Sequence, residues 1–65
     1  MTLEEEKYFV SQGMRKYGGS FVKALGEALA HADPYNAEKI KNNWSKLWKE
    51  YALIGHQIEI AGDMP

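Results

Sequence analysis

The second half of the chain decides the fold, and over residues 37–61 it reads AEKIKNNWSKLWKEYALIGHQIEIA. Its apolar residues recur at spacings of three and four, as Ala37, Ile40, Trp44, Leu47, Tyr51, Ile54, Ile58 and Ala61. This spacing keeps a stripe on one side of an α-helix, and its sustained repetition is what a coiled-coil seam needs. We therefore predict a long helix whose apolar stripe is buried against another surface.

Two residues mark the start of this helix, whereas the sequence leaves two positions for its end. Asp33 is a favourable N-cap, and Pro34 suits the first helical position. A helix over 34–54 follows, extending to 61 if Gly55 does not stop it, and the full length would be about 42 Å. Weak helix formers at 42–45 mark a kink or a new start as the alternative.

Two shorter helices precede it, over 2–17 and 20–32. Thr2 and Glu5 have the spacing of a capping box, and Ser20 after two glycines is placed to cap the second helix. The small residues of the second helix predict that it lies at the centre of the packing. We expect an all-α fold of three helices, as a bundle or hairpin with a long C-terminal helix.

The first two helices are too short to cover the stripe of the third, so we expect one small domain over 1–65 that self-associates. A chain of 65 residues buries only about 60% of its unfolded surface, which makes a lone monomer marginal. There is no cysteine for a disulfide, and oligomerisation is a usual remedy. We predict self-association through Leu47, Tyr51, Ile54 and Ile58.

The charge balance gives no reason to expect nucleic acid or membrane as partner. The net charge is −1, from 8 Lys+Arg and 9 Asp+Glu, and no run of about 18 apolar residues is present to cross a bilayer. The first residues, Met-Thr-Leu-Glu-Glu-Glu, are acidic, whereas a secretory signal begins with basic ones. We therefore expect a cytoplasmic protein of its host cell.

A possible anion site lies where the first two helices meet. Backbone amides at a helix N-terminus attract phosphate, so Gly18, Gly19 and Ser20, helped by Lys23, could hold a phosphate or nucleotide ligand. The alternative is an ordinary interhelical turn, which we favour because the spacing is not that of a P-loop. The lysines at 39, 46 and 49 predict a basic face on the long helix, and a solvated face explains it better than nucleic acid.

Aromatic residues supply the strongest sign of a protein interface. Trp and Tyr dominate interface hot spots, and Trp44, Trp48 and Tyr51 stand three or four residues apart. The alternative is the chain's own core; we expect Trp44 and Tyr51 in the core or seam and Trp48 at its edge. The candidate interface residues are Trp44, Leu47, Trp48, Tyr51, Ile54 and Ile58.

We predict no catalytic, metal-binding or cofactor-binding residue, and hence no enzyme. His31 and His56 each lack the neighbours of a catalytic triad, and two histidines without cysteine are too few for a typical structural zinc site. The glutamates at 4–6 stand at a helix start, where they complement the helix dipole. General acid catalysis instead needs a carboxyl in an apolar pocket.

Three segments resemble a group of short phage- and prophage-encoded proteins of unassigned role: YGGSFVKALGEAL over 17–29, HAD over 31–33, and the stretch from Trp44 to Tyr51. In that group a segment like Phe-Pro-Glu-Tyr-Trp follows, whereas this chain has WSKLW at 44–48. The missing proline favours a continuous helix here. The resemblance covers about half the chain and implies an origin in a mobile element, where very small proteins often bind and block a host component.

The leading functional hypothesis is therefore a non-enzymatic, phage-derived protein. It would bind and modulate a host or phage protein stoichiometrically, as an inhibitor and as a homo-oligomer. The first alternative is a module that sequesters a phosphate or nucleotide ligand at the Gly-Gly-Ser turn. A helix-turn-helix that binds nucleic acid is a further alternative with little support in the charge distribution.

Overall fold

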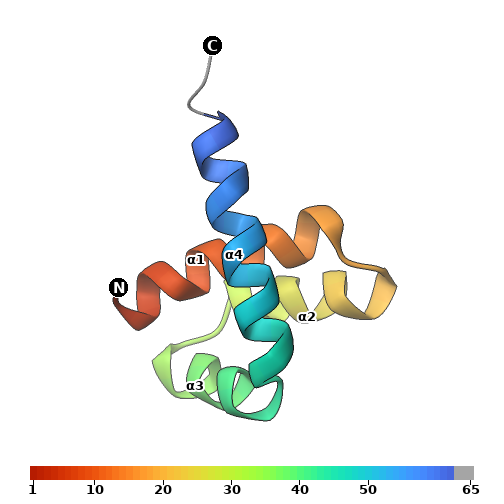
Figure 1. The fold of residues 1–65 in the computed structure, drawn as a ribbon. Coiled ribbons are helices and arrows are strands. Elements are labelled where there is room, and N and C mark those ends of the chain that lie inside the picture. The colour runs from red at the N-terminus through yellow and green to blue at the C-terminus, as the bar shows by residue number, and fades with distance from the viewer. Residues whose placement is uncertain (63–65) are drawn as a thin grey trace.

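The computed structural model describes the backbone of residues 1–62 and the side chains of residues 1–58. The described part contains four helices and no strand: α1 (Leu3–Tyr17), α2 (Ser20–Ala30), α3 (Pro34–Asn43) and α4 (Ser45–Gly62). The predicted all-α class is confirmed, whereas the predicted count of three helices is wrong (Figure 1).

The expected continuous helix is broken at Trp44. This residue has φ −126° and ψ 50°, outside the helical region, and its N–H donates to the carbonyl of Ile40 at 2.9 Å to close α3. Its own carbonyl accepts the N–H of Trp48 at 2.8 Å, which begins α4. Asparagine and serine flank the break and lower the cost of leaving the helix. The break lets α4 turn away and cross α1 (Figure 1).

The far end of the long helix agrees with the longer of the two predictions. The helix α4 continues through Gly55 and ends at Gly62, so Gly55 does not stop it. Its last turns extend beyond the other three helices (Figure 1). Among the described residues, no helix is both long enough and apolar enough to cross a bilayer.

Two of the three predicted helix caps are present. The N–H of Glu5 donates to Thr2 Oγ1 at 3.2 Å, and the N–H of Thr2 donates to Glu5 Oε1 at 3.1 Å, which completes the capping box. Asp33 Oδ1 accepts the N–H of Asn36 at 2.8 Å at the start of α3. The predicted cap by Ser20 is wrong, because Gly19 occupies the N-cap and Ser20 is already helical.

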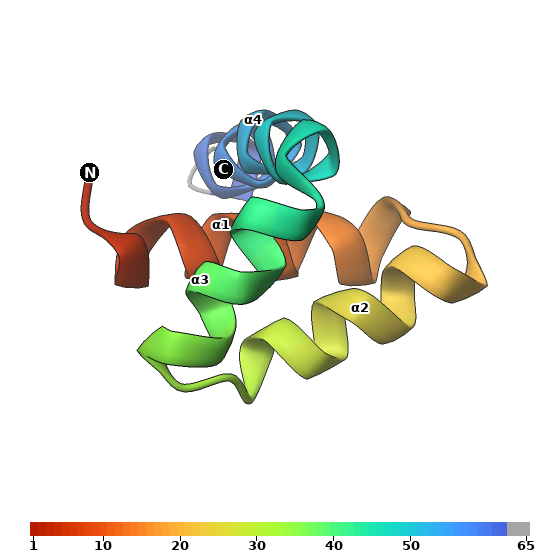
Figure 2. The same cartoon turned by 90° about the horizontal axis from the view of Figure 1, so that it is seen from below.

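The central helix is α1 rather than the expected α2. Figure 2 shows α4 on one side of α1 and α2 on the other, and these two pairs make the most extensive contacts between elements. The exposed small residues of α2 include Ala24 and Ala28. They remain at the surface because α2 is covered on one side only.

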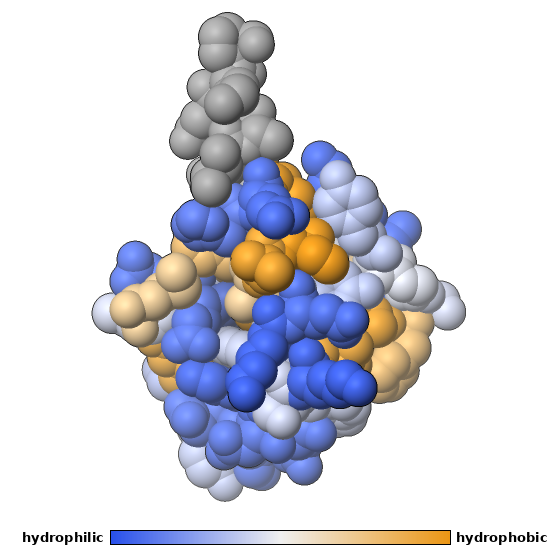
Figure 3. All heavy atoms as spheres, viewed as in Figure 1, coloured by the Kyte–Doolittle hydropathy of each residue, from blue (hydrophilic) through white to orange (hydrophobic). Residues whose placement is uncertain are grey.

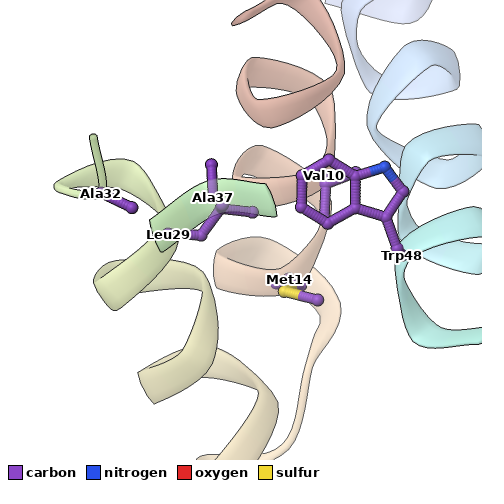
Figure 4. Close-up of a cluster of buried hydrophobic side chains, with 6 residues drawn as sticks. All are labelled: Val10, Met14, Leu29, Ala32, Ala37 and Trp48. Carbon is purple, nitrogen blue, oxygen red and sulfur yellow. The ribbon is translucent and has the colours of Figure 1, made fainter. Parts of the chain in front are cut away.

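The core is built around α1 and receives one large side chain from α4. Its buried members are Val10, Met14, Leu29, Ala32, Ala37 and Trp48 (Figure 4). Trp48 is 2% exposed and extends its ring toward α1, whereas Trp44 is 38% exposed. The predicted order of the two tryptophans is therefore wrong: the break at Trp44 reorients α4 so that Trp48 faces the core. Tyr51 lies half-buried beside it, as predicted for the core or its seam.

Glycines allow α1 to approach both of its neighbours closely. A Cβ on Gly13 would lie 2.6 Å from the carbonyl oxygen of Tyr51, and one on Gly55 would overlap the backbone of Phe9. On α2, a Cβ on Gly26 would lie 2.7 Å from the Cβ of Met14. Interhelical distance depends on the side chains at the contact, so these glycines set how closely the helices pack.

Candidate functional site

Two exposed aromatic rings meet where α2 begins and α3 ends. The ring centroids of Phe21 and Trp44 lie 6.3 Å apart, and the ring planes are inclined by 56°. Phe21 is 60% exposed, more than the 38% of Trp44. Aromatic pairs at this separation attract each other, yet most of the Phe21 ring still faces solvent.

A groove of about 470 Å³ lies between α2 and α3, and Trp44 of this aromatic pair lines it whereas Phe21 does not. The two helices meet at the turn after Ala30 and diverge toward the other end (Figure 2). We call it the α2–α3 groove. Its lining residues are Ala28, His31, Ala32, Asn36, Lys39, Ile40, Asn43 and Trp44. The lining is thus an apolar strip of alanine, isoleucine and tryptophan. It is bordered by the amides of two asparagines, by a lysine ammonium and by a histidine ring.

A second hollow, of about 490 Å³, lies between the end of α1 and the outer part of α4. It is lined by Tyr17, Ile54, Gln57 and Ile58, and we call it the α1–α4 hollow. Tyr17 is 59% exposed, and Leu53 on α4 is 63% exposed. Figure 3 shows hydrophobic side chains gathered on the face of the molecule that α4 crosses in the view of Figure 1.

The six predicted interface residues do not share one surface. Trp48 is buried in the core, and Leu47 and Tyr51 pack half-buried against it. Ile54 and Ile58 lie in the α1–α4 hollow, while Trp44 lies in the α2–α3 groove. The aromatic partner of Trp44 is Phe21, which the sequence analysis did not select. The sequence did contain an indication of its exposure. Phe21 lies in the first turn of a helix that follows two glycines, and such turns often face solvent.

The predicted anion site has the geometry of a tightly packed turn. Gly18 ends α1 with φ −75° and ψ 157°, and a Cβ there would collide with the side chain of Val22. Gly19 caps α2 without any side-chain hydrogen bond, and Ser20 and Lys23 are exposed. Packing alone therefore accounts for Gly18, while the first amides of α2 carry no side-chain acceptor.

Arg15, which the sequence places near this turn, is engaged elsewhere. Its Nε lies 3.5 Å from Glu27 Oε1, across the contact between α1 and α2. The predicted basic face is also divided, because Lys39 belongs to α3 whereas Lys46 and Lys49 belong to α4. The break at Trp44 means that these three lysines do not follow one helix, so the predicted continuous face is wrong.

The partly buried charges of the described chain join helices. Glu6 accepts a hydrogen bond from the indole N–H of Trp48 at 3.0 Å and lies 3.1 Å from Lys41 Nζ. The Trp48 hydrogen bond, followed by the Lys41 contact, lowers the pKa of Glu6 below its ordinary range. A carboxyl group that acts as a general acid in catalysis instead has a raised pKa. Lys7 Nζ donates to the carbonyl of Ala32 at 2.7 Å, just after α2.

The two histidines lie apart. The ring of His56 packs edge-on against Phe9, with centroids 5.2 Å apart, and His31 lines the α2–α3 groove. Among the described residues, no group of three His, Cys, Asp or Glu side chains comes together as metal ligands would. His56 therefore contacts α1, and His31 forms part of the groove wall.

Comparison of the chain with protein-family models, with curated proteins and with solved structures gives no match. The resemblance to short phage-encoded proteins accordingly stays a prediction.

Proposed function

We propose that this chain is a non-enzymatic binding protein that acts stoichiometrically on another protein. The observation that carries the proposal is the exposed Phe21–Trp44 pair at the end of the α2–α3 groove. Full burial of a side chain such as Phe is worth about 1.5–3 kcal/mol, and the exposed parts of Phe21 and Trp44 forgo a share of it. A partner surface that covers them recovers this free energy.

The position of the pair suits an interface anchor. Trp and other aromatic residues are enriched at interface hot spots, which tend to lie in or beside well-packed pockets. The ring of Trp44 packs against Phe21 and is 38% exposed, so its packing already restrains it. A restrained ring loses less conformational entropy on binding. The resemblance to phage-encoded proteins supports a host or phage protein as the partner.

The proposal includes self-association through the outer part of α4, which the α1–α4 hollow supports. Ile54 and Ile58 border this hollow, and Tyr17 and Leu53 add exposed apolar surface around it. Leu47 and Tyr51, also predicted to take part, are partly buried against the core. The pairing surface we propose is therefore centred on Ile54 and Ile58.

Affinity capture from host lysate tests the main proposal. The wild-type chain and the control Lys49→Ser should retain the same protein in near-stoichiometric amount, and the double variant Phe21→Ser/Trp44→Ser should not. The control removes an exposed side chain from α4 that lines neither the α2–α3 groove nor the α1–α4 hollow. Circular dichroism confirms that each variant is folded. Retention of no protein, or equal retention by all three chains, contradicts the proposal.

Ligand binding at the Gly-Gly-Ser turn is a second candidate, because the first amides of α2 lack a side-chain cap and Lys23 is exposed. A ligand at a hundred times its dissociation constant adds about 2.7 kcal/mol of stability. Inorganic phosphate and a panel of nucleotides should then raise the melting temperature of the wild type, but not of Lys23→Ala. The absence of any shift in the wild type rules this candidate out.

A further inference from the structure

The α2–α3 groove has features that define the chemistry of what it binds, and this inference rests on the proposed function. Its apolar strip runs from Ala32 and Ala28 to Ile40 and Trp44. Ala28 is exposed, so the α2 wall presents a small side chain between the aromatic end of the groove and His31. Because smaller side chains at a contact allow a shorter interhelical distance, a partner helix can approach α2 closely here.

The groove carries a positive charge. Lys39 lines it, and the lining contains no carboxylate among the residues whose side chains are described. The nearby acidic groups are engaged in other ways. Asp33 accepts the N–H of Asn36 at the start of α3, and Glu27 faces Arg15 at the contact with α1.

The lysine is held in a defined place. Lys39 Nζ lies 4.8 Å from the centre of the Tyr35 ring, a cation–π contact that restrains the long side chain. This contact leaves the N–H donors of the ammonium free to bind an acceptor. Asn36 and Asn43 stand on the same face of α3, three or four residues on either side of it.

The distance along α3 sets the spacing of the ligand. Lys39 and Trp44 are five residues apart, which is about 7.5 Å along a helix axis. A partner helix lying along the groove therefore meets Trp44 and Lys39 with side chains about four or five residues apart. One must be apolar to contact Trp44 and Phe21, and the other must carry negative charge to pair with Lys39.

We propose that the α2–α3 groove binds an acidic amphipathic segment of a partner protein, with an apolar anchor packed against the Phe21–Trp44 pair and a carboxylate about one helical turn away on Lys39. The positive charge of Lys39 distinguishes this occupant from a basic or neutral one, and the small side chain of Ala28 leaves room for it.

Selection from a random peptide library against the whole chain provides the probe. The enriched peptides should combine an apolar residue with Asp or Glu three to five positions away. A synthetic peptide of the enriched sequence, measured by fluorescence anisotropy, should bind at least tenfold more weakly to Trp44→Ala. For the exposed Lys39→Gln the loss should be about three- to fivefold, and greater for Lys39→Glu. Added salt should weaken binding to the wild type.

The lysine variants keep the proposal testable if Trp44→Ala does not fold, because Lys39 is at the surface. Lys46→Gln, on α4, is the matched control and should bind as the wild type does. Four outcomes would overturn the inference: no enriched peptide, enrichment of basic or neutral peptides, binding that is unchanged in Lys39→Glu, or Lys39-dependent retention of nucleic acid. A fall in oligomer mass in Lys39→Glu would place a second copy in the groove and overturn it as well.

The inference and the proposed function can fail separately. If lysate capture depends on Phe21 and Trp44 but no acidic peptide competes with the captured protein, the binding function stands and the assigned ligand chemistry is wrong. If neither experiment shows binding, both fail.

Discussion

At the scale of single residues, Glu6 joins three helices through one carboxylate. From α1 it accepts the indole N–H of Trp48 on α4, and it lies 3.1 Å from the ammonium of Lys41 on α3. The same ammonium lies 5.9 Å from the centre of the Trp48 ring. Hydrogen bonds to a charged acceptor are stronger than neutral ones, so this cluster helps to fix the orientation of the largest core side chain.

Replacement of Trp48 should be the most damaging single change in the described core. Loss of a buried tryptophan costs about 3–5 kcal/mol, which is comparable to the whole stability of a domain this small. We therefore expect Trp48→Ala to be largely unfolded at 25 °C by circular dichroism. Trp48→Phe should remain folded with a lower urea midpoint. The matched variant Trp44→Phe should unfold close to the wild type, and an equal loss in both phenylalanine variants would contradict the assigned burial.

The same carboxylate makes stability depend on pH. Because the Trp48 hydrogen bond and the Lys41 contact lower the pKa of Glu6 in the folded state, its ionised form stabilises the fold. This contribution is fully present above the unfolded value, near 4.5, and is lost as the pH falls through the lowered value. The Thr2 hydrogen bonds lower the pKa of Glu5 in the same direction.

We expect the free energy of unfolding of the wild type to fall on acidification below about pH 5. In Glu6→Gln this fall should be shallower, and in Glu5→Gln/Glu6→Gln shallower still. Urea titrations at a series of pH values measure the slope. A slope in Glu6→Gln as steep as in the wild type would show that this carboxylate does not carry the effect.

At the scale of elements, the crossing of α1 and α4 depends on two glycines inside helices. Gly13 and Gly55 face each other across the contact, and a Cβ on either would meet the backbone of the opposite helix. Intrinsic propensity alone predicts that alanine stabilises a helix interior by about 1 kcal/mol relative to glycine. The contact between α1 and α4 predicts the opposite, namely that alanine at either position destabilises the fold.

We therefore expect Gly55→Ala and Gly13→Ala to lower the free energy of unfolding, each by more than about 1 kcal/mol, because overpacking forces the helices apart. Gly19→Ser is the control. Nothing lies within 4 Å of a Cβ at Gly19, and serine is a better N-cap than glycine by a few tenths of a kcal/mol. Stabilisation by Gly55→Ala would mean that the helices do not cross at this point.

Local signals predicted the helix starts and the tertiary structure decided the rest. The capping box at Thr2 and the cap at Asp33 follow from neighbouring residues, so the sequence was sufficient. The restart after residues 42–45 was visible as an alternative, but not its direction. That direction buries Trp48 and exposes Trp44, and it also places Gly55, one of the two predicted ends of the helix, in a contact with α1. No spacing rule contains such information, because it depends on how α4 lies against α1.

The same limit applies to the candidate site. The sequence indicated an aromatic interface and selected Trp44, but it grouped this residue with others on one presumed helix face. The α2–α3 groove instead combines residues from before and after a turn, and Phe21 joins Trp44 from 23 positions away. Such a pairing follows only from the packing of α2 and α3.

At the scale of the whole molecule, the helix break distributes the residues of one apolar stripe over three different places in the fold. Ala37 is buried in the core, Trp44 lies in the α2–α3 groove, and Ile54 and Ile58 lie in the α1–α4 hollow. The last turns of α4 extend past the other helices (Figure 1). The fold thus leaves apolar surface on two sides, one suited to a partner and the other to a second copy.

If the α1–α4 hollow is the pairing surface, light scattering should give the wild type a mass of at least twice the 7.4 kDa of one chain. Polar substitution at Ile54 and Ile58 should return it to the mass of one chain, since burying unpaired amides at the contact is unfavourable. Ile54→Gln/Ile58→Gln keeps good helix formers in α4, so circular dichroism should be unchanged. Lys46→Gln, also on α4, should retain the wild-type mass. A wild-type chain of 7.4 kDa at every concentration would remove self-association from the proposal while leaving the α2–α3 groove as a site for a different protein.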